Sequence, residues 1–393
     1  MADTPATAIR VSTFDTIDTV PERDWLRFIP TTNPLLQPPY LRLLEETQQG
    51  EMEFIYALVH REDRLIGVCY FQVVRFRGSN LLPYFPAAST GTWRWFKNTF
   101  MSLSKKVVAR LDMPLLVSGN LFITGEQGLY FVSDISELEK SYYLAQTIEQ
   151  IQTERPDIRT ALLPDMYEPS GDFDQAFLHK NYQRIYVEAD MSMTLPADWH
   201  SFDDYMNAIS SKYRVRAKKV FQSSQAITGH EMTADELESQ LDRLYEIYVL
   251  VAEKADFNIA KFPKSYFLLE KKRSPDLYKV FGYYLEGRLV GFMSLFILEN
   301  KTEVHYCGID YSINKDYALY QRMLYDIVRY AIEHDLRRLH FGRTAPEVKS
   351  TLGAIPHPMY GYIRHRHPII NQIMGIFTSR LKPREYTLRN PFK

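Results

Sequence analysis

Five cationic side chains crowd into one short stretch of the chain, "SSKYRVRAKKVFQSS" (residues 210–224). They are Lys212, Arg214, Arg216, Lys218 and Lys219, and the stretch contains no acidic residue. Like charges one helical turn apart repel each other, and a solvated helix usually balances them with acids. The stretch therefore predicts a helix that binds an anion, either the phosphates of a donor (CoA, acyl-carrier phosphopantetheine or tRNA) or a phospholipid surface. The alternative is a surface helix that pairs with acids elsewhere in the fold.

A second group that could do chemistry lies in the run "TEVHYCGID" (residues 302–310). If this run is a β-strand, alternation places Glu303, His305 and Cys307 on one face. Histidine titrates near neutral pH, so His305 is a candidate general base for activating an amine. His340, at the end of the next expected strand, is the competing candidate. Either histidine could instead be a hydrogen-bonded residue of the core or its rim.

The segment "FGRTAPEVKSTLGA" (residues 341–354) combines a loop with the start of a helix. Thr344 is expected to cap that helix, and Pro346 fits its first turn. Arg343 and Lys349 flank the helix start, where backbone N–H groups and the lysine could hold an anionic donor group or a developing oxyanion. The alternative is a capped helix whose lysine reaches to solvent.

The two histidines of "IRHRHP", His365 and His367, would share one face of a strand. Two ligands do not complete a metal site, and the sequence has no Cys-x-x-Cys or His-Glu-x-x-His spacing. We therefore expect no metal centre.

The balance of charge limits the class of partner. The chain has 47 Lys and Arg residues and 48 Asp and Glu residues, for a formal net charge of -1. Binding to nucleic acid needs a region of positive potential, so we expect no DNA partner and place tRNA behind small donors. Cys69 and Cys307 lie far apart in apolar runs, which is typical of reduced thiols in the cytoplasm. The longest apolar run, residues 277–300, is interrupted by Glu286 and Arg288 before it could span a bilayer.

Two regions share one layout although their sequences differ. Residues 53–76 and residues 277–298 each predict a β-hairpin, followed by a further strand, a long helix and a short apolar strand. The long helices are expected at residues 137–152 and 315–334. The repetition predicts an α/β (α+β) fold of two tandem units, each with a mixed, mostly antiparallel sheet flanked by helices. We divide the chain into units of residues 1–190 and 191–393.

The second unit has two additional expected helices before its hairpin, at residues 203–224 and 234–255. Asp203 is expected to cap the first helix. Thr233 is expected to cap the second, and Glu236 three residues later completes a capping-box pattern.

The basic helix, the second hairpin and "HFGRTAPEVKSTLGAIPHPMYGY" (residues 340–362) together resemble the GNAT-like acyltransferase superfamily. Within it they resemble the FemAB-like transferases, described as peptidoglycan biosynthesis or recognition proteins. Those families pack two GNAT-like halves together, and their second half carries a pattern of Gly-Arg-Ser/Thr, a spacer, a lysine, then glycine, proline and tyrosine. The matching positions are Gly342, Arg343, Thr344, Lys349, Gly353, Pro356 or Pro358, and Tyr360. The resemblance implies two tandem GNAT-like units and transfer of an acyl or aminoacyl group.

One segment departs from the GNAT pattern. GNAT domains that use acetyl-CoA cradle its pyrophosphate with a glycine-rich turn before a helix. The corresponding segment here has no glycine between Tyr311 and Met323. Fem-type enzymes resemble GNATs in fold yet take aminoacyl-tRNA, so a standard CoA clamp is not expected.

The residues and the resemblance together predict a cytoplasmic N-acyltransferase. It would move an acyl group from acyl-CoA or an acyl carrier protein to the amine of a lipid or cell-envelope precursor. His305, or else His340, would be the base, Lys349 and Arg343 would hold donor or developing charge, and the basic helix would grip donor phosphates. Two alternatives stay open: a Fem-type aminoacyl-tRNA-dependent peptidoglycan aminoacyltransferase, and a non-catalytic binder of an envelope lipid or glycan.

A further stretch, residues 89–111, predicts contact with an anionic membrane surface. Trp93, Phe96 and Phe100 recur at helical spacing, and the polar neighbours include Arg94 and several lysines. Aromatic anchors among cations are typical of a peripheral helix at the inner membrane, whereas core packing is the alternative. The C-terminal residues 369–393, apolar and then basic, would be a second contact.

Overall fold

The computed structural model describes residues 9–77, 112–167, 171–254, 259–299, 301–378 and 386–393. The expected interfacial helix at residues 89–111 lies outside these ranges. In the first half of the chain the strands are β1 (Ile9–Phe14), β2 (Met52–Arg61), β3 (Arg64–Arg77), β4 (Asp112–Ser118), β5 (Leu129–Phe131), β6 (Thr160–Tyr167) and β7 (Gln183–Thr194). The helices are α1 (Glu22–Leu26), α2 (Pro38–Thr47), α4 (Glu137–Glu154) and α5 (Gly171–His179), with short 3-10 helices at Ile17–Thr19 and Pro34–Leu36.

The second half contains the remaining described elements. Its strands are β8 (Ile227–Glu231), β9 (Tyr278–Leu285), β10 (Arg288–Leu298), β11 (Lys301–Ile309), β12 (Arg338–His340) and β13 (Ile355–His365). Its helices are α6 (Phe202–Ala208), α7 (Ser211–Ser223), α8 (Ala234–Ser239), α9 (Leu241–Lys254), α10 (Lys264–Arg273), α11 (Tyr311–Tyr317), α12 (Leu319–Glu333), α13 (Pro346–Ser350) and α14 (Pro368–Thr378).

The expected duplication is present in the sheet. Each half has a hairpin whose second strand pairs with a third strand, namely β2-β3-β4 and β9-β10-β11. In each half that third strand also pairs in parallel with the strand after the long helix, as β4 with β6 and β11 with β12. The other strand pairings among the described residues are antiparallel. The prediction of two tandem units with mixed, mostly antiparallel sheets is confirmed.

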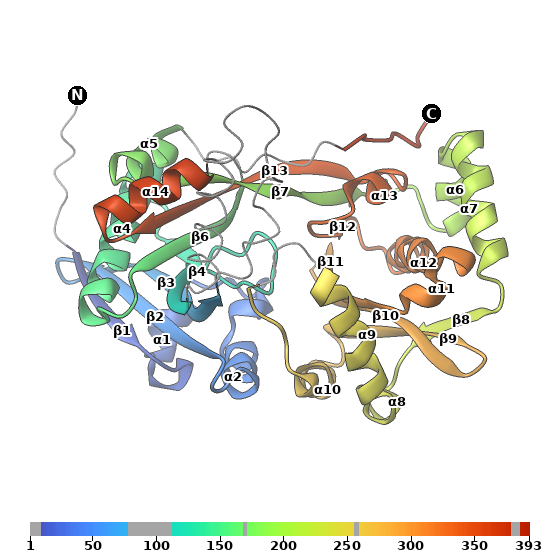
Figure 1. Cartoon of the computed structure of the whole chain (residues 1–393), viewed down its shortest axis with the longest axis horizontal. Coiled ribbons are helices and arrows are strands. Elements are labelled where there is room, and N and C mark those ends of the chain that lie inside the picture. Colours follow the sequence, from blue (N-terminus) through green and yellow to red (C-terminus); the bar gives the residue numbers. More distant parts are fainter. Residues whose placement is uncertain (1–8, 78–111, 168–170, 255–258, 300, 379–385) are drawn as a thin grey trace, which may run out of the picture.

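Two long strands join the halves into one sheet (Figure 1). The described strands run in the order β1-β2-β3-β4-β6-β13-β7-β12-β11-β10-β9-β8, with β5 beside β3. β7 pairs with β13 along most of its length and with β12 at its end, while β13 also pairs with β6. The division at residues 190 and 191 therefore falls inside β7, and β13 returns from the chain's end to the first half's sheet. That division remains a proposal.

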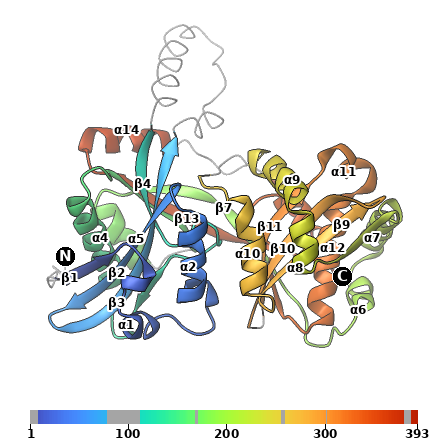
Figure 2. The same cartoon turned by 90° about the horizontal axis from the view of Figure 1, so that it is seen from below.

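Hydrophobic packing also crosses the junction. One core cluster contains Tyr40 and Phe122 from the first half together with Phe262 and Tyr266 from the second. Phe122 stacks on Phe262 with ring centroids 3.9 Å apart. Helices α2 and α10 lie side by side here in both views (Figures 1 and 2). The halves thus share a core, which fixes the walls of any site between them.

Two expected helices are each divided in two. The residues expected as one helix at 203–224 form α6 and α7, and Ser201, not Asp203, caps α6 by accepting from the Asp204 N–H. The long helix expected from residue 315 is broken at Ala318, whose φ of 49° is left-handed. Thr233 does accept from the Glu236 N–H as expected.

None of the helices in the described ranges is both long and apolar enough to cross a membrane.

Candidate active site

A pocket opens where two neighbouring strands separate. β11 and β12 pair in parallel over three residues, from Lys301–Glu303 against Arg338–His340. Beyond them, residues 304–307 and 341–344 line opposite sides of a cavity of about 250 Å³. A strand edge that faces a cavity offers backbone N–H and C=O groups to a ligand. An extended donor with amide groups could add to this edge as a short strand.

Both halves of the chain line this pocket. Leu121, Thr124 and Asp165 come from the first half, while Tyr248 of α9 and Tyr320 of α12 come from the second. Ligand sites commonly form at the junction of two structural units. The walls combine apolar side chains with a small number of ionisable groups.

A β-bulge shapes the β11 wall. Met293 pairs with Cys307 and Leu295 with Val304, so His305 and Tyr306 together oppose the single residue Ser294. The Ser294 hydroxyl accepts from the Tyr306 N–H at 3.0 Å and donates to the Tyr306 carbonyl at 3.2 Å. The extra residue reverses the alternation after Tyr306, and Cys307 packs with Val304 in the core on the α12 side. The prediction that Cys307 shares a face with His305 is therefore wrong.

His305 lies in an aromatic cage. Its ring centroid is 4.6 Å from Tyr306, 4.9 Å from Phe296 and 5.4 Å from Phe262. Neither ring nitrogen has a hydrogen-bond partner among the described residues. Burial lowers the pKa of His305 to about 3. An imidazole this weakly basic stays neutral at physiological pH, so the geometry argues against His305 as the general base.

His340 occupies a different setting, beside a buried carboxylate. Its Nδ1 lies 3.2 Å from Asp190 Oδ2, and the Tyr167 hydroxyl donates to the same oxygen at 2.9 Å. Burial alone would raise the pKa of Asp190, but these hydrogen bonds and the positive charge of Lys349 lower it below its usual value. An ionised Asp190 holds the proton of His340 on Nδ1 and leaves Nε2 as a proton acceptor.

Glu303 is the second carboxyl group next to His340. It stands in register with His340 across the β11–β12 pairing and is 5% exposed. Burial raises the pKa of Glu303 to about 7, against the opposing charges of His340 and Lys301. Two carboxyl groups whose pKa values are pushed apart around one histidine are typical of acid–base sites. Asp190 and Glu303 therefore support His340, rather than His305, as a base.

Arg343 reaches across the junction. Its Nη1 donates to Asp165 Oδ1 at 2.7 Å, joining the loop after β12 to β6 of the first half. Asp165 has a left-handed φ of 57°, which is uncommon for a non-glycine residue and recurs at functional sites. Burial raises the pKa of Asp165, and the Arg343 charge opposes that shift. Arg343 is thus already paired and lines the pocket as half of an ion pair.

Lys349 organises the loop that follows β12. Its Nζ donates to the carbonyl oxygens of Phe341, Gly342 and Arg343. Burial lowers the pKa of Lys349 to about 8. Three hydrogen bonds use all the protons of an ammonium group, so Lys349 shapes the pocket wall instead of presenting an N–H to substrate.

The start of α13 differs in part from the sequence expectation. Ala345 occupies the N-cap position, with no side-chain cap, and Pro346 lies in the first turn as expected. Thr344 has a left-handed φ of 67° and does not cap the helix. The loop reverses direction here because Gly342, Thr344 and Ala345 all adopt positive φ around the lysine.

The basic helix α7 lies outside the pocket but near one end of it. Arg214 donates to the carbonyl oxygens of Met206 and Asn207 at the end of α6. The other four cationic residues are exposed, and within the described chain none of them makes an ion pair. They are Lys212, Arg216, Lys218 and Lys219.

The end of α7 approaches the start of α12. Arg322, in the first turn of α12, donates to the Ser224 hydroxyl just after α7 at 3.2 Å. Tyr320 of the same turn lines the pocket. The exposed Lys218 and Lys219 therefore sit within two turns of the helix end that adjoins the pocket.

Sequence reasoning missed four of the polar residues that make up this site. They are Asp165, Tyr167, Asp190 and Tyr320. Asp165 stands as a lone acid in the apolar run "ALLPDMY", and Asp190 follows Glu188 in "EADMSM". A lone acid among residues expected to be buried was the available signal, since buried carboxylates need a partner.

The described residues contain no group of three or more His, Cys, Asp or Glu side chains placed to hold a metal ion. His365 and His367 instead contact each other directly, with the His367 N–H donating to His365 Nδ1 at 2.9 Å.

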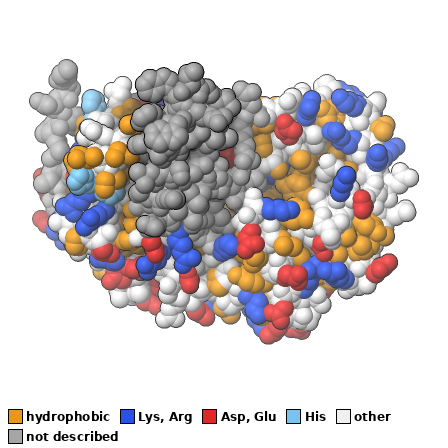
Figure 3. All heavy atoms as spheres, in the orientation of Figure 1, with side chains coloured by type: hydrophobic (Ala, Val, Ile, Leu, Met, Phe, Trp, Pro, Cys, Tyr) orange, Lys and Arg blue, Asp and Glu red, His pale blue; other side chains and the backbone are white. Residues whose placement is uncertain are grey.

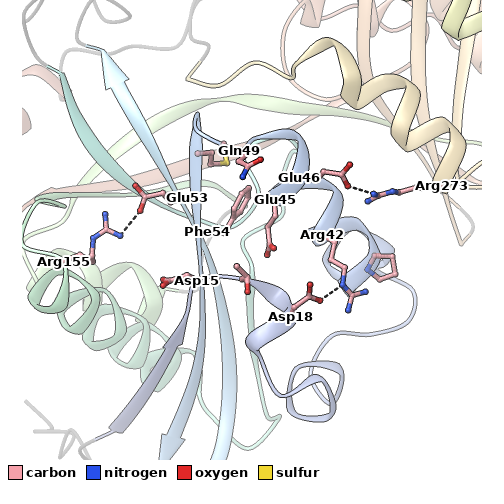
Figure 4. Close-up of a pocket in the computed structure, with 13 residues that line it drawn as sticks. Asp15, Asp18, Arg42, Glu45, Glu46, Gln49, Glu53, Phe54, Arg155 and Arg273 are labelled. Atoms are coloured by element: carbon pink, nitrogen blue, oxygen red, sulfur yellow. Dashed lines mark hydrogen bonds and ion pairs between the residues drawn. The ribbon is translucent and has the colours of Figure 1, made fainter.

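A larger hollow of about 1010 Å³ lies on the surface beside α2 (Figure 4). Its charged side chains pair with one another, as Arg155 does with Glu53 at 2.8 Å and Arg273 with Glu46. Such a lining offers little unpaired charge to a substrate, and we assign it no role.

Comparisons with known proteins agree with the architecture. Residues 211–350 match the family model described as an acetyltransferase (GNAT) domain. Residues 211–350 are therefore a GNAT domain, which makes the chain an acyltransferase enzyme. The matched region contains the point where β11 and β12 separate.

Two solved structures show the same fold across both halves. FemX is 12% identical, with a TM-score of 0.53 over 85% of this chain and 94% of FemX. A tandem GNAT protein from the clavulanic acid biosynthesis pathway is 11% identical, with a TM-score of 0.55 over 92% of this chain and 99% of that protein. At these identities the likeness establishes the fold. No curated protein matches the sequence.

Proposed function

We propose that this acyltransferase moves an acyl group from a thioester, carried by CoA or an acyl carrier protein, to the amine of a lipid or cell-envelope precursor. The observation that carries this proposal is the pocket between the diverging strands β11 and β12, with the pair formed by Asp190 and His340 beside it. The strand edge would hold the amide-containing arm of the donor, and the pocket would hold the thioester.

The donor phosphates would lie at the start of α12. The first backbone N–H groups of a helix have no intrahelical partner and attract anions. At α12 the Tyr320 N–H already donates to Asn314 Oδ1 at 2.9 Å, so the phosphates would bind the other N–H groups of that turn. The exposed Lys218 and Lys219 at the nearby end of α7 would add positive charge there. Because α11 replaces a glycine-rich turn, this site relies more on side-chain cations than on a backbone cradle.

Proton transfer would use His340 and Tyr320. His340 Nε2, oriented by Asp190, would take a proton from the attacking amine directly or through one water. The amine nitrogen would form a bond to the thioester carbonyl carbon, and the carbon–sulfur bond would break. Tyr320, which lines the pocket, would give its phenolic proton to the sulfur as the carbon–sulfur bond breaks.

Cys307 does not need to act as a nucleophile in this scheme. Burial raises the pKa of its thiol to about 11, so the reactive thiolate is scarce at neutral pH. Direct attack of the amine on the thioester therefore fits the site better than an acyl-cysteine intermediate.

A steric block with a matched control tests the proposal. Cys307 lines the pocket between β11 and β12, so Cys307→Phe should fill the thioester position. Cys307→Ser leaves the volume of the side chain nearly unchanged. Thiol release from a panel of acyl-CoA thioesters, with amino-lipid vesicles as acceptor, should be lost in C307F and retained in C307S. Mass spectrometry of the lipid should show one acyl group added per thiol released.

The alternative functions predict different results in the same assay. Transfer from aminoacyl-tRNA without turnover of any acyl-CoA would contradict the thioester proposal and favour the Fem-type reaction. Binding of envelope lipid or glycan without turnover of either donor would favour the non-catalytic binder. Equal thiol release by C307F and wild type would show that the donor does not occupy this pocket.

A further inference from the structure

Helix α14 exposes large apolar side chains on a surface of the first half. The exposed fractions are 62% for Ile369, 46% for Ile370 and 49% for Ile373. The sequence of the helix, PIINQIMGIFT, contains no charged residue. Large apolar side chains gathered on one exposed helix mark an interaction site more often than chance exposure.

The polar side of α14 faces inward. Asn371 is 6% exposed, and its Nδ2 donates to the Asn181 carbonyl at 2.8 Å while its Oδ1 accepts from the His365 N–H at 2.9 Å. Gly375 lies against the Gln183 side chain, where a Cβ would come within 2.6 Å of it. The helix is thus docked through a buried amide and a glycine, with isoleucines outward, which is the reverse of an ordinary amphipathic surface helix.

Cations border this apolar face. Arg159, Arg366 and His367 are exposed, and the Arg366 N–H donates to the Arg159 carbonyl at 2.8 Å, so they lie together at the start of α14. The nearby Glu149 is already paired with Arg364 and Lys180. Figure 3 shows hydrophobic side chains gathered at this end of the face, with histidines beside them and Lys and Arg below. An apolar patch with a cationic border complements an anionic lipid surface.

We propose that α14 docks this enzyme on an anionic bilayer. Ile369, Ile370 and Ile373 would enter the boundary between headgroups and acyl chains, while Arg159 and Arg366 would face lipid phosphates. This inference does not depend on which donor or acceptor the active site uses.

Flotation of the full-length protein with vesicles tests the docking directly. The protein should float with vesicles of phosphatidylcholine and phosphatidylglycerol and remain at the bottom with phosphatidylcholine alone. Raising the salt concentration should release it, because exposed charges are screened. Failure of the wild type to float with either vesicle would overturn the proposal.

A pair of matched variants locates the contact. Ile369→Asn with Ile373→Asn should weaken vesicle affinity by at least about tenfold, since two large apolar side chains no longer enter the membrane. Ile355→Asn changes an isoleucine that is 58% exposed on β13, away from α14, and should leave affinity unchanged. Equal affinity of the double variant and wild type would contradict docking through α14.

Two further measurements separate docking from other effects. Arg159→Glu should weaken binding to phosphatidylglycerol vesicles roughly tenfold, since each basic side chain near an anionic surface contributes to the attraction. The melting temperature of each variant should match the wild type, because the altered side chains are exposed. If the double variant instead turns a dimer into a monomer and still floats, α14 binds a second copy and the lipid proposal is wrong.

Discussion

The two halves repeat one arrangement of strands but differ where those strands separate. In the first half, β4 pairs with β3 in continuous register, and the residues that pair with β6 are Leu115, Leu116 and Val117. In the second half, β11 has a bulge against β10, the residues that pair with β12 are Lys301, Thr302 and Glu303, and His305 and Cys307 follow where the pairing ends. The same supersecondary unit thus forms an apolar scaffold in the first half and a pocket lined by ionisable side chains in the second half.

The two halves contribute different parts of the candidate site. The first half supplies the wall that closes the pocket and two carboxylates that reach the second half's residues, Asp165 to Arg343 and Asp190 to His340. The second half supplies the strand split, the histidine and the lysine-centred loop. A functional site can therefore arise on one copy of a repeated unit while the other copy positions it.

The largest expected effect comes from breaking the link between Asp190 and His340. Asp190→Asn would lose the charge that orients the imidazole, so kcat should fall on the order of 10³-fold, as for other buried Asp–His pairs at catalytic sites. Steady-state thiol release measures this effect. The control is Asp174→Asn, at a first-half acid that accepts from the Tyr362 hydroxyl, and it should retain activity. Equal kcat in D190N and D174N would remove the proposed role of the second half's histidine.

A smaller loss of activity is expected from Tyr320→Phe. Removing the phenolic proton should lower kcat on the order of 100-fold with little change in KM, because the hydroxyl acts on the leaving thiolate. Tyr311→Phe on the adjacent helix α11 is the control. A donor with a more acidic thiol should recover much of the Y320F rate, and the absence of such recovery would argue against an acid role.

Stability should show how far the second half's loop depends on its lysine. Lys349→Met would leave three carbonyl oxygens without their donor and should lower the free energy of unfolding by about 3 kcal/mol. Lys271→Met removes another buried lysine, yet its partner Glu231 keeps an ion pair with Lys279. We expect K271M to lose about 1 kcal/mol, and chemical denaturation compares the two variants. A K349M variant as stable as wild type would mean that the loop holds its shape without the three hydrogen bonds from Lys349.

The pH dependence of stability should report the buried carboxyl group of Glu303. Burial raises the pKa of Glu303 to about 7, so the folded protein holds this proton more tightly than the unfolded chain does. Glu303 therefore reduces stability progressively as pH rises from about 4.5 to about 7, by up to about 3 kcal/mol. Glu303→Gln should flatten the stability profile over that range.

Glu270 provides the matched comparison outside the active site. Burial also raises its pKa to about 7. Glu270→Gln should flatten the stability profile in the same direction but leave the pH–rate profile unchanged, whereas E303Q should alter both. Identical pH–rate profiles for E303Q and wild type would restrict Glu303 to a structural role.

The smallest expected effect concerns Cys307. Its raised thiol pKa predicts slow alkylation at neutral pH despite its position on the pocket wall. Mass spectrometry after iodoacetamide treatment of the folded protein should find little modification at Cys307, and labelling should increase as pH approaches about 11. Rapid labelling at neutral pH would reopen the question of an acyl-cysteine intermediate.

Local patterns in the sequence predict most of the secondary structure. The alternating apolar runs around residues 53–76 and 277–298 form β2-β3 and β9-β10, and the periodic stretch from residue 137 forms α4. These elements follow from side-chain periodicity, which neighbouring residues alone set. The repeated order of such elements is also what indicated a duplicated α/β unit.

For the site residues, too, the sequence and the tertiary structure determined different properties. The sequence by itself determined which residue types were available: a histidine next to a strand end, a lysine after a glycine-arginine loop, and an uncompensated basic helix. Tertiary structure alone decided their surroundings. A one-residue bulge turned Cys307 away from His305, a cage of aromatic rings suppressed the basicity of His305, and β7 brought Asp190 to His340 from 150 positions away. The physical reason is that pKa and reach depend on burial and on partners distant in sequence, which no local pattern records.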